Sequence, residues 1–139
     1  MVDIARGATI YWDTNALIYM TEGSAAFKQS LEEFFKQAIA ATAQFVTSEL
    51  ALTEALVHPV RDNNKVLLEA YNDLFEHVVG AHPITRGILI RAAELRTEAR
   101  KYRTPDAIHL ASAMVQQADV FLTGDKQLAR CKEVRVETV

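Results

Sequence analysis

Four acidic residues stand just after apolar segments or within the first two turns of predicted helices. Asp13 follows the apolar run ATIYW directly, and Asp125 follows VFLT after a single glycine. Asp106 comes directly after a Thr-Pro pair, and Glu54 lies two turns into a segment with helical spacing. A carboxylate at the end of a buried strand is costly unless something pairs with it. The acids therefore raise the question of what they bind.

Carboxylates that converge repel each other and raise each other's pKa, so they seldom gather without a cation. Oxygen ligands of this kind favour Mg²⁺ or Mn²⁺. Two such ions about 3.5–4 Å apart can activate a water molecule and stabilise the leaving oxygen of a phosphodiester. If the four acids meet at one place, the sequence predicts a metal-dependent phosphodiesterase.

Each acid also has an ordinary structural explanation. Asp13 can cap the helix that follows it, and Asp106 can satisfy the N-terminus of its own helix. Asp125 can be a turn residue after Gly124, and Glu54 can be a solvated helix residue. Only the joint placement of the acids favours a metal site over these separate roles.

The elements that position the acids alternate between strands and helices. Short apolar runs predict strands, and apolar residues at helical spacing predict helices. The predicted strands cover residues 8–12, 43–47, 77–84, 120–123 and 134–139. The predicted helices cover residues 24–40, 49–57, a segment opened by Asn63, 85–100, 104–117 and 126–130, with a short helix after Asp13. This alternation predicts a parallel sheet covered on both faces, with the acids at the carboxyl ends of its strands.

Polar residues and prolines set the predicted helix ends. Ser48, Thr85 and Thr104 stand where a side chain can cap the following helix. Pro105 then takes the first helical position. Pro59 is predicted to end the helix that begins near residue 49.

Length and composition restrict the class of protein. The 139 residues (15.5 kDa) suit one domain, residues 1–139. The net charge of -3 argues against non-specific binding along a nucleic-acid backbone, but not against a nuclease whose cation is a metal. Cys131 is the single cysteine, which excludes an intrachain disulfide. We see neither a signal-peptide pattern nor an apolar run of membrane-spanning length, so we expect a cytoplasmic protein without membrane partners.

Four motifs carry a family resemblance, and they occur in the family's order along nearly the whole chain. They are DTNALI (13–18), TSELALTEAL (47–56), TPDAIHLASA (104–113) and FLTGDKQL (121–128). With them the sequence resembles the PIN domain (PilT N-terminus) family, and most of all the VapC-like toxin ribonucleases. The resemblance implies a three-layer α/β/α sandwich whose five-stranded parallel sheet has the strand order 3-2-1-4-5.

The resemblance also implies a function and a site. It implies a Mg²⁺- or Mn²⁺-dependent endoribonuclease that acts on RNA, forms a homodimer and is neutralised by a cognate antitoxin protein. The catalytic and metal-binding residues that it implies are Asp13, Glu54, Asp106 and Asp125. Asp13 and Asp106 are the expected direct ligands, and the other two acids complete the shell directly or through water. Asn15 is expected to orient the first acid, and Thr123 to bond a carboxylate or a water.

Several residues have two interpretations. His109 lies three residues after Asp106 and is either a helper of the site or a satisfied core histidine; the core role is the favoured one. A basic cluster precedes Asp106 and either contacts phosphates or complements a helix dipole: Arg96, Arg100, Lys101 and Arg103. Tyr11 and Trp12 are predicted to be core strand residues. Residues 24–40 and 88–95 are candidate dimer surfaces.

Two other hypotheses compete with the nuclease. A non-catalytic PIN module would bind RNA or protein and use the acids for structure; no acid of the set is lost, which disfavours it. A flavodoxin-like or receiver domain would need an acidic pair near the first strand. Asp3 lies too far before that strand to pair with Asp13.

Overall fold

A five-stranded parallel sheet forms the centre of the molecule. The computed structural model describes residues 3–23, 25–98 and 102–139. The strands are β1 (Thr9–Trp12), β2 (Gln44–Ser48), β3 (Gly80–His82), β4 (Val120–Thr123) and β5 (Val136–Thr138). Their order is β3-β2-β1-β4-β5, and every pairing is parallel. The predicted sheet and its strand order are confirmed, so the carboxyl ends of all strands lie along one edge.

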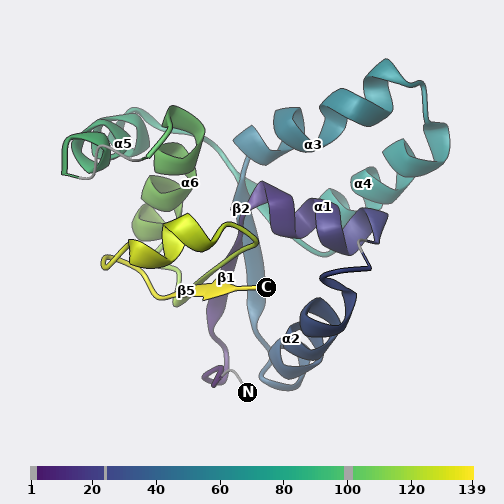
Figure 1. Ribbon diagram of the computed structural model, residues 1–139, viewed down its shortest axis with the longest axis horizontal. Helices are drawn as coiled ribbons and strands as arrows, with labels where there is room; N and C mark the ends of the chain where they lie inside the picture. Colours follow the sequence, from purple (N-terminus) through teal and green to yellow (C-terminus); the bar gives the residue numbers. More distant parts are fainter. Residues whose placement is uncertain (1–2, 24, 99–101) are drawn as a thin grey trace.

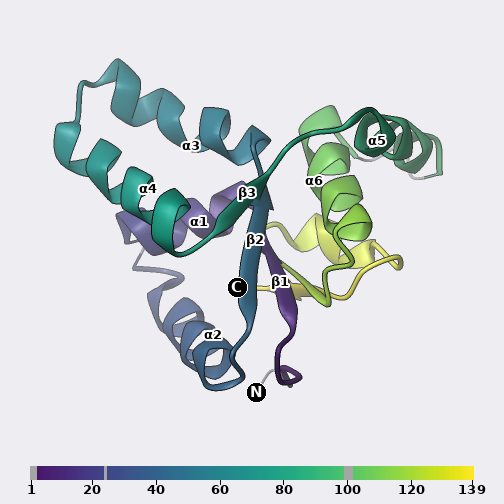
Figure 2. The same ribbon diagram turned by 180° about the vertical axis from the view of Figure 1, so that it is seen from behind.

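Helices cover both faces of the sheet. They are α1 (Thr14–Glu22), α2 (Lys28–Ala40), α3 (Leu50–Arg61), α4 (Lys65–His77), α5 (Arg86–Glu98), α6 (Thr104–Val115) and the 3-10 helix η1 (Lys126–Arg130). Helices α1 to α4 lie on one side of the sheet and α5, α6 and η1 on the other (Figure 1, Figure 2). The three-layer α/β/α sandwich is therefore confirmed. None of the helices in the described ranges is long and apolar enough to cross a membrane.

The central strand β1 separates two hydrophobic cores. Ile10 and Trp12 point into the core under α1 to α4, whereas Tyr11 points into the core under α5 and α6. All three side chains are fully buried. A strand buried on both faces reads as a continuous apolar run, which is the pattern that residues 8–12 show. The prediction that Tyr11 and Trp12 are core residues is confirmed.

Some predicted element ends are wrong, and the structure gives the reasons. Pro59 lies inside α3, which continues to Arg61, because the N–H groups of Asp62 and Asn64 still bond the carbonyls of His58 and Pro59. The third strand is shorter than residues 77–84, because α4 extends to His77.

The predicted helix caps have mixed outcomes. Ser48 and Thr85 accept hydrogen bonds from Leu50 N–H and Ile88 N–H, as expected. Thr104 is the first residue of α6 and not its cap, because the hydroxyl is bonded by an arginine from α5.

Candidate active site

Asp13 is the buried acid at the centre of the candidate site. It follows β1, is 4% exposed and caps the N-terminus of α1. Its Oδ1 accepts the Thr14 N–H at 2.9 Å, and its Oδ2 accepts the Thr123 hydroxyl at 2.7 Å. Burial raises the pKa of Asp13, although His109 and the two hydrogen bonds act against the shift, and the charge of Asp106 adds to it. The fold therefore holds a carboxylate whose charge is poorly compensated.

Asp106 is the second acid at this edge of the sheet. It lies in the first turn of α6, and its side chain is 18% exposed. Its charge is close enough to Asp13 to raise the pKa of that buried carboxyl. The Nε of Arg103 lies 3.4 Å from its Oδ2. The charges of the two predicted direct ligands thus act on each other in this structure.

Glu54 is held by neighbours from two other elements, α1 and α6. Its Oε1 accepts the Thr14 hydroxyl at 2.8 Å and lies 2.6 Å from Nε2 of His109. Burial raises the pKa of Glu54, but the hydrogen bond and charge of His109 and the bond from Thr14 outweigh it, so the net shift is downward. Glu54 is thus a stable carboxylate whose hydrogen bonds go to His109 and Thr14.

The end of β4 joins Asp13 to the fourth acid. The Thr123 hydroxyl, which donates to Asp13, also accepts the Asp125 N–H at 3.0 Å. Asn15 accepts the Gly124 N–H at 2.8 Å and so ties α1 to this turn. Asp125 is half-buried, and its Oδ1 accepts the Gln127 N–H at the start of η1. In this structure Asp125 therefore has the turn role that competed with metal binding.

The donor chemistry of the site can be compared with what a divalent cation needs. Within residues 3–23, 25–98 and 102–139, no group of three His, Cys, Asp or Glu side chains is arranged to hold a metal ion. Mg²⁺, however, is usually bound by one or two carboxylates together with waters and substrate phosphates. Asp13 and Asp106 supply two carboxylates of this kind, and a cation would compensate the buried charge. The donor set therefore fits a hard divalent ion with few protein ligands.

The described residues of the basic cluster have different roles. Arg96 donates to the Tyr102 carbonyl and to the Thr104 hydroxyl, which braces the start of α6. Arg100 and Lys101 lie outside the described residues. The side chain of Arg103 is 81% exposed and reaches Asp106. Of Arg96 and Arg103, the two members that the structure describes, Arg103 is the one that pairs with an acid of the candidate site.

Sequence reasoning missed two residues of this site. Thr14 bonds Glu54, and the Tyr11 hydroxyl lies 2.7 Å from Nδ1 of His109. Their partners are 40 and 98 residues away in the chain, so no local pattern could reveal the contacts. The available signal was the polar atom on each side chain, because a buried hydroxyl needs a partner. His109 is buried, as the core interpretation predicted, and it also bonds one of the acids.

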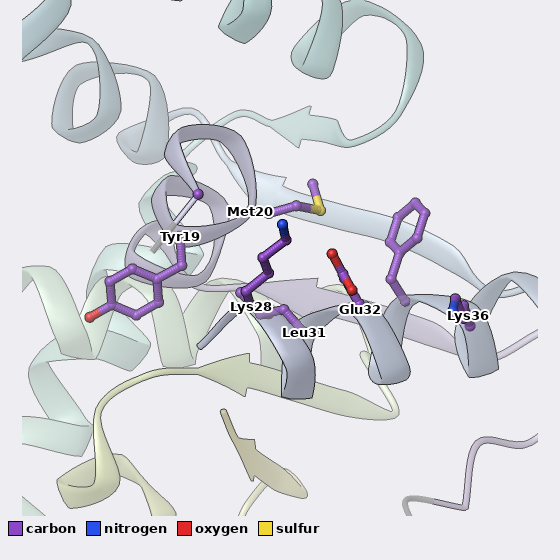
Figure 3. Close-up of a pocket in the computed structure, with 8 residues that line it drawn as sticks. Tyr19, Met20, Lys28, Leu31, Glu32 and Lys36 are labelled. Atoms are coloured by element: carbon purple, nitrogen blue, oxygen red, sulfur yellow. The ribbon is translucent and has the colours of Figure 1, made fainter. Parts of the chain in front are cut away.

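An apolar pocket lies away from the acids. It opens between α1 and α2, where Figure 3 shows Tyr19, Met20 and Leu31 beside three charged side chains of α2. None of the four acids lines it. The pocket is therefore separate from the four acids of the candidate site.

Solved structures share the fold. A chain of the VapBC2 complex from Rickettsia felis, solved with promoter DNA, matches with a TM-score of 0.71 and 17% identity over 94% of this chain and 98% of that chain. A toxin–antitoxin complex from Klebsiella pneumoniae matches with a TM-score of 0.66 and 23% identity over 93% and 96%. DNA-bound VapBC from Salmonella typhimurium matches with a TM-score of 0.69 and 16% identity over 94% and 98%. At these identities the likeness shows the fold.

The sequence itself settles the family. No protein of curated function matches the chain. The family model of the PIN domain matches residues 10–134, which include all four acids and both hydrophobic cores. Together with the five-stranded sheet of order 3-2-1-4-5, this match shows that the chain belongs to the PIN domain family.

Proposed function

We propose that this protein is a divalent-metal-dependent endoribonuclease and the toxin of a toxin–antitoxin pair. One observation carries the proposal: Asp13 is a carboxylate that is only 4% exposed where β1 ends, and the charge of Asp106 acts on it. Such a pair is destabilising unless a cation binds it. PIN domains are generally nucleases, which agrees with this chemistry.

Different residues of the chain would bind the metal, position its ligands and contact the substrate. Asp13 and Asp106 would hold Mg²⁺ or Mn²⁺, with Glu54 and Asp125 acting beside them directly or through water. A bound ion of this kind supplies an activated water and stabilises the charge that develops on the phosphate. Thr123 fixes Asp13, and Asn15 fixes the turn that carries Asp125. Arg103 is exposed at the edge and would contact an RNA phosphate.

The biological role is proposed from the likeness in fold. The three similar structures are toxin–antitoxin or VapBC complexes, which supports a cognate antitoxin as the partner of this chain. We also propose a single-domain, cytoplasmic protein that acts as a homodimer. RNA is the proposed substrate because the sequence resembles the VapC-like toxin ribonucleases. With a net charge of -3, substrate binding would depend on the metal and a few arginines.

A non-catalytic PIN module is the second candidate. It is favoured by the hydrogen bonds of Glu54 and Asp125, which give both acids structural partners in the described part of the chain. In such a module the acids would stabilise helix starts and turns, and RNA or protein would bind without being cleaved.

RNA cleavage separates the two candidates. Purified protein and Asp106→Asn would be incubated with mixed transfer and ribosomal RNA in Mg²⁺, in Mn²⁺ and in EDTA. The nuclease hypothesis predicts discrete cuts that need metal and are lost in the variant. Equal cutting by both preparations would indicate a contaminant. RNA binding without cutting in either metal would favour the non-catalytic module.

A further inference from the structure

His109 connects the candidate site to the core through both ring nitrogens. The residue lies on α6 and is 1% exposed. Nε2 lies 2.6 Å from Oε1 of Glu54, and Nδ1 lies 2.7 Å from the hydroxyl of Tyr11. Both nitrogens of this buried ring therefore have polar partners, and one of these partners is an acid of the candidate site. The hydrogen bonds from Tyr11 to His109 and from His109 to Glu54 thus link β1, α6 and α3.

The partners of the ring assign one of its protons. A glutamate carboxylate accepts hydrogen bonds and donates none. The Thr14 hydroxyl donates its hydrogen to the same Oε1, and its oxygen also lies 3.1 Å from Nε2, where it can only accept. The contact of 2.6 Å between Nε2 and Oε1 therefore requires a proton on Nε2. This assignment follows from the hydrogen-bond network, as it must for histidine.

The two donors leave the other oxygen of Glu54 available. His109 and Thr14 both bond Oε1, and among the described residues Oε2 takes no hydrogen bond. The Glu54 side chain is 33% exposed, so Oε2 can reach solvent or a ligand. Nε2 of His109 also lies 3.8 Å from Oδ1 of Asp13, which places the histidine between the two acids.

We propose that His109 is a positioning residue of this site, which holds Glu54 beside Asp13 by donating its Nε2–H to Oε1. The Tyr11 hydroxyl holds the ring at Nδ1, and the Thr14 hydroxyl donates a second hydrogen bond to Oε1 of Glu54. The inference rests on the proposed function, because it assigns Glu54 to the site that would hold the metal. Partners that orient the ligands of a metal typically change metal affinity or activity by 10–100-fold when they are lost.

Two substitutions distinguish the loss of the hydrogen-bond donor from the loss of the ring's volume. His109→Gln keeps an N–H donor at the end of the side chain, whereas His109→Leu keeps an apolar side chain of similar size without a donor. His77→Gln is the matched control, because that histidine is 71% exposed at the end of α4. Mn²⁺ binding would be titrated by calorimetry on each variant after its thermal melting curve shows that it is folded.

The proposal predicts a graded loss of Mn²⁺ affinity. His109→Leu is expected to weaken Mn²⁺ binding by about 10–100-fold. His109→Gln should keep most of the affinity, and His77→Gln all of it. Folded His109→Leu with unchanged Mn²⁺ affinity would overturn the proposal, as would equal losses in the Gln and Leu variants.

Nuclear magnetic resonance tests the hydrogen bond without metal and without activity. Long-range ¹H–¹⁵N spectra of the ring are expected to show His109 protonated at Nε2, and Glu54→Gln should shift those ring signals. A ring protonated at Nδ1 alone would overturn the proposal even if His109→Leu does not fold. Absence of Mn²⁺ binding by the unaltered protein would instead contradict the proposed function, and the spectra would still decide whether His109 holds Glu54.

Discussion

At the scale of single residues, the cost of burying Asp13 is the feature that most directly indicates a ligand. The carboxylate is 4% exposed, and the charge of Asp106 acts on it. Its two hydrogen bonds, from Thr14 and Thr123, do not restore the ordinary pKa. The protein without metal should therefore be less stable than it would be with a neutral side chain at this position.

Asp13→Asn is expected to stabilise the protein in EDTA. Asparagine caps a helix about as well as aspartate does, and it removes the buried charge. We expect the Tm at pH 7 to rise by about 3 °C, which corresponds to about 1 kcal/mol in a chain of this length. Mg²⁺ should raise the Tm of the unaltered protein and leave that of the variant unchanged. A variant that melts lower in EDTA would show that the negative charge itself stabilises the fold.

The stability difference between Asp13→Asn and the unaltered protein should depend on pH in a definite direction. Because the pKa of Asp13 is raised on folding, the folded state binds its proton more tightly than the unfolded chain does. The destabilisation is complete above the folded pKa and disappears below the unfolded value of about 3.9. The advantage of Asp13→Asn should therefore be largest at neutral pH and vanish as the pH falls toward 4. Thermal melts of both proteins across this range measure it.

Arg103 is expected to contribute one phosphate contact. Its side chain is 81% exposed and reaches only Asp106 among the described acids. Arg103→Ala should weaken binding of single-stranded RNA and reduce the slope of log K against log salt by about 0.7. Lys36→Ala on α2 removes one positive charge away from the acids and is the matched control. An unchanged salt slope for Arg103→Ala would remove this residue from the RNA contacts.

At the scale of elements, the turn after β4 is packed tightly against α1. A Cβ built on Gly124 would lie 2.5 Å from Cε2 of Tyr19. The Tyr19 ring cannot withdraw freely, because it stacks on Phe27 with 4.3 Å between the ring centroids. This contact and the bond from Gly124 N–H to Asn15 keep the fourth acid at the start of α1.

Gly124→Ala is therefore expected to destabilise the protein by about 1–3 kcal/mol through overpacking. Gly87→Ala is the matched control, because its Cβ would meet only the Thr85 hydroxyl at 3.8 Å. Alanine in the helix α5 should be neutral or stabilising by up to about 1 kcal/mol. Urea unfolding of both variants measures the contrast. If Gly124→Ala is as stable as Gly87→Ala, the turn is not packed as described.

The order and type of the elements could be predicted from sequence, whereas the polar contacts between them could not. Buried strands appear in the sequence as apolar runs, so the sequence predicts all five strands. The third strand is shorter than predicted, because α4 occupies the residues before it. Pro59 was expected to end α3, but the N–H groups of Asp62 and Asn64 bond the carbonyls of the last turn, and the helix continues to Arg61. The bond between Glu54 and His109 depends on how α3 meets α6, which no local pattern encodes.

At the scale of the whole molecule, the sheet order explains why distant residues share one site. β1 lies in the middle with β2 and β4 on either side, so their carboxyl ends carry residues from three separate parts of the chain. α1 and α3 start from this same end of the sheet (Figure 1). The placement of Asp13 beside the turn of Asp125 is thus a consequence of topology, and the charge of Asp106, in the first turn of α6, also acts on Asp13.

Anomalous diffraction from crystals soaked in Mn²⁺ tests the proposed metal site most directly. We expect a peak at the carboxyl end of β1, with an oxygen of Asp13 and an oxygen of Asp106 each about 2.1 Å from the ion. Asp106→Asn crystals treated identically should lose the peak or show it much weaker. A Mn²⁺ ion bound elsewhere, or the same peak in both crystals, would contradict the assignment of these carboxylates as the metal ligands.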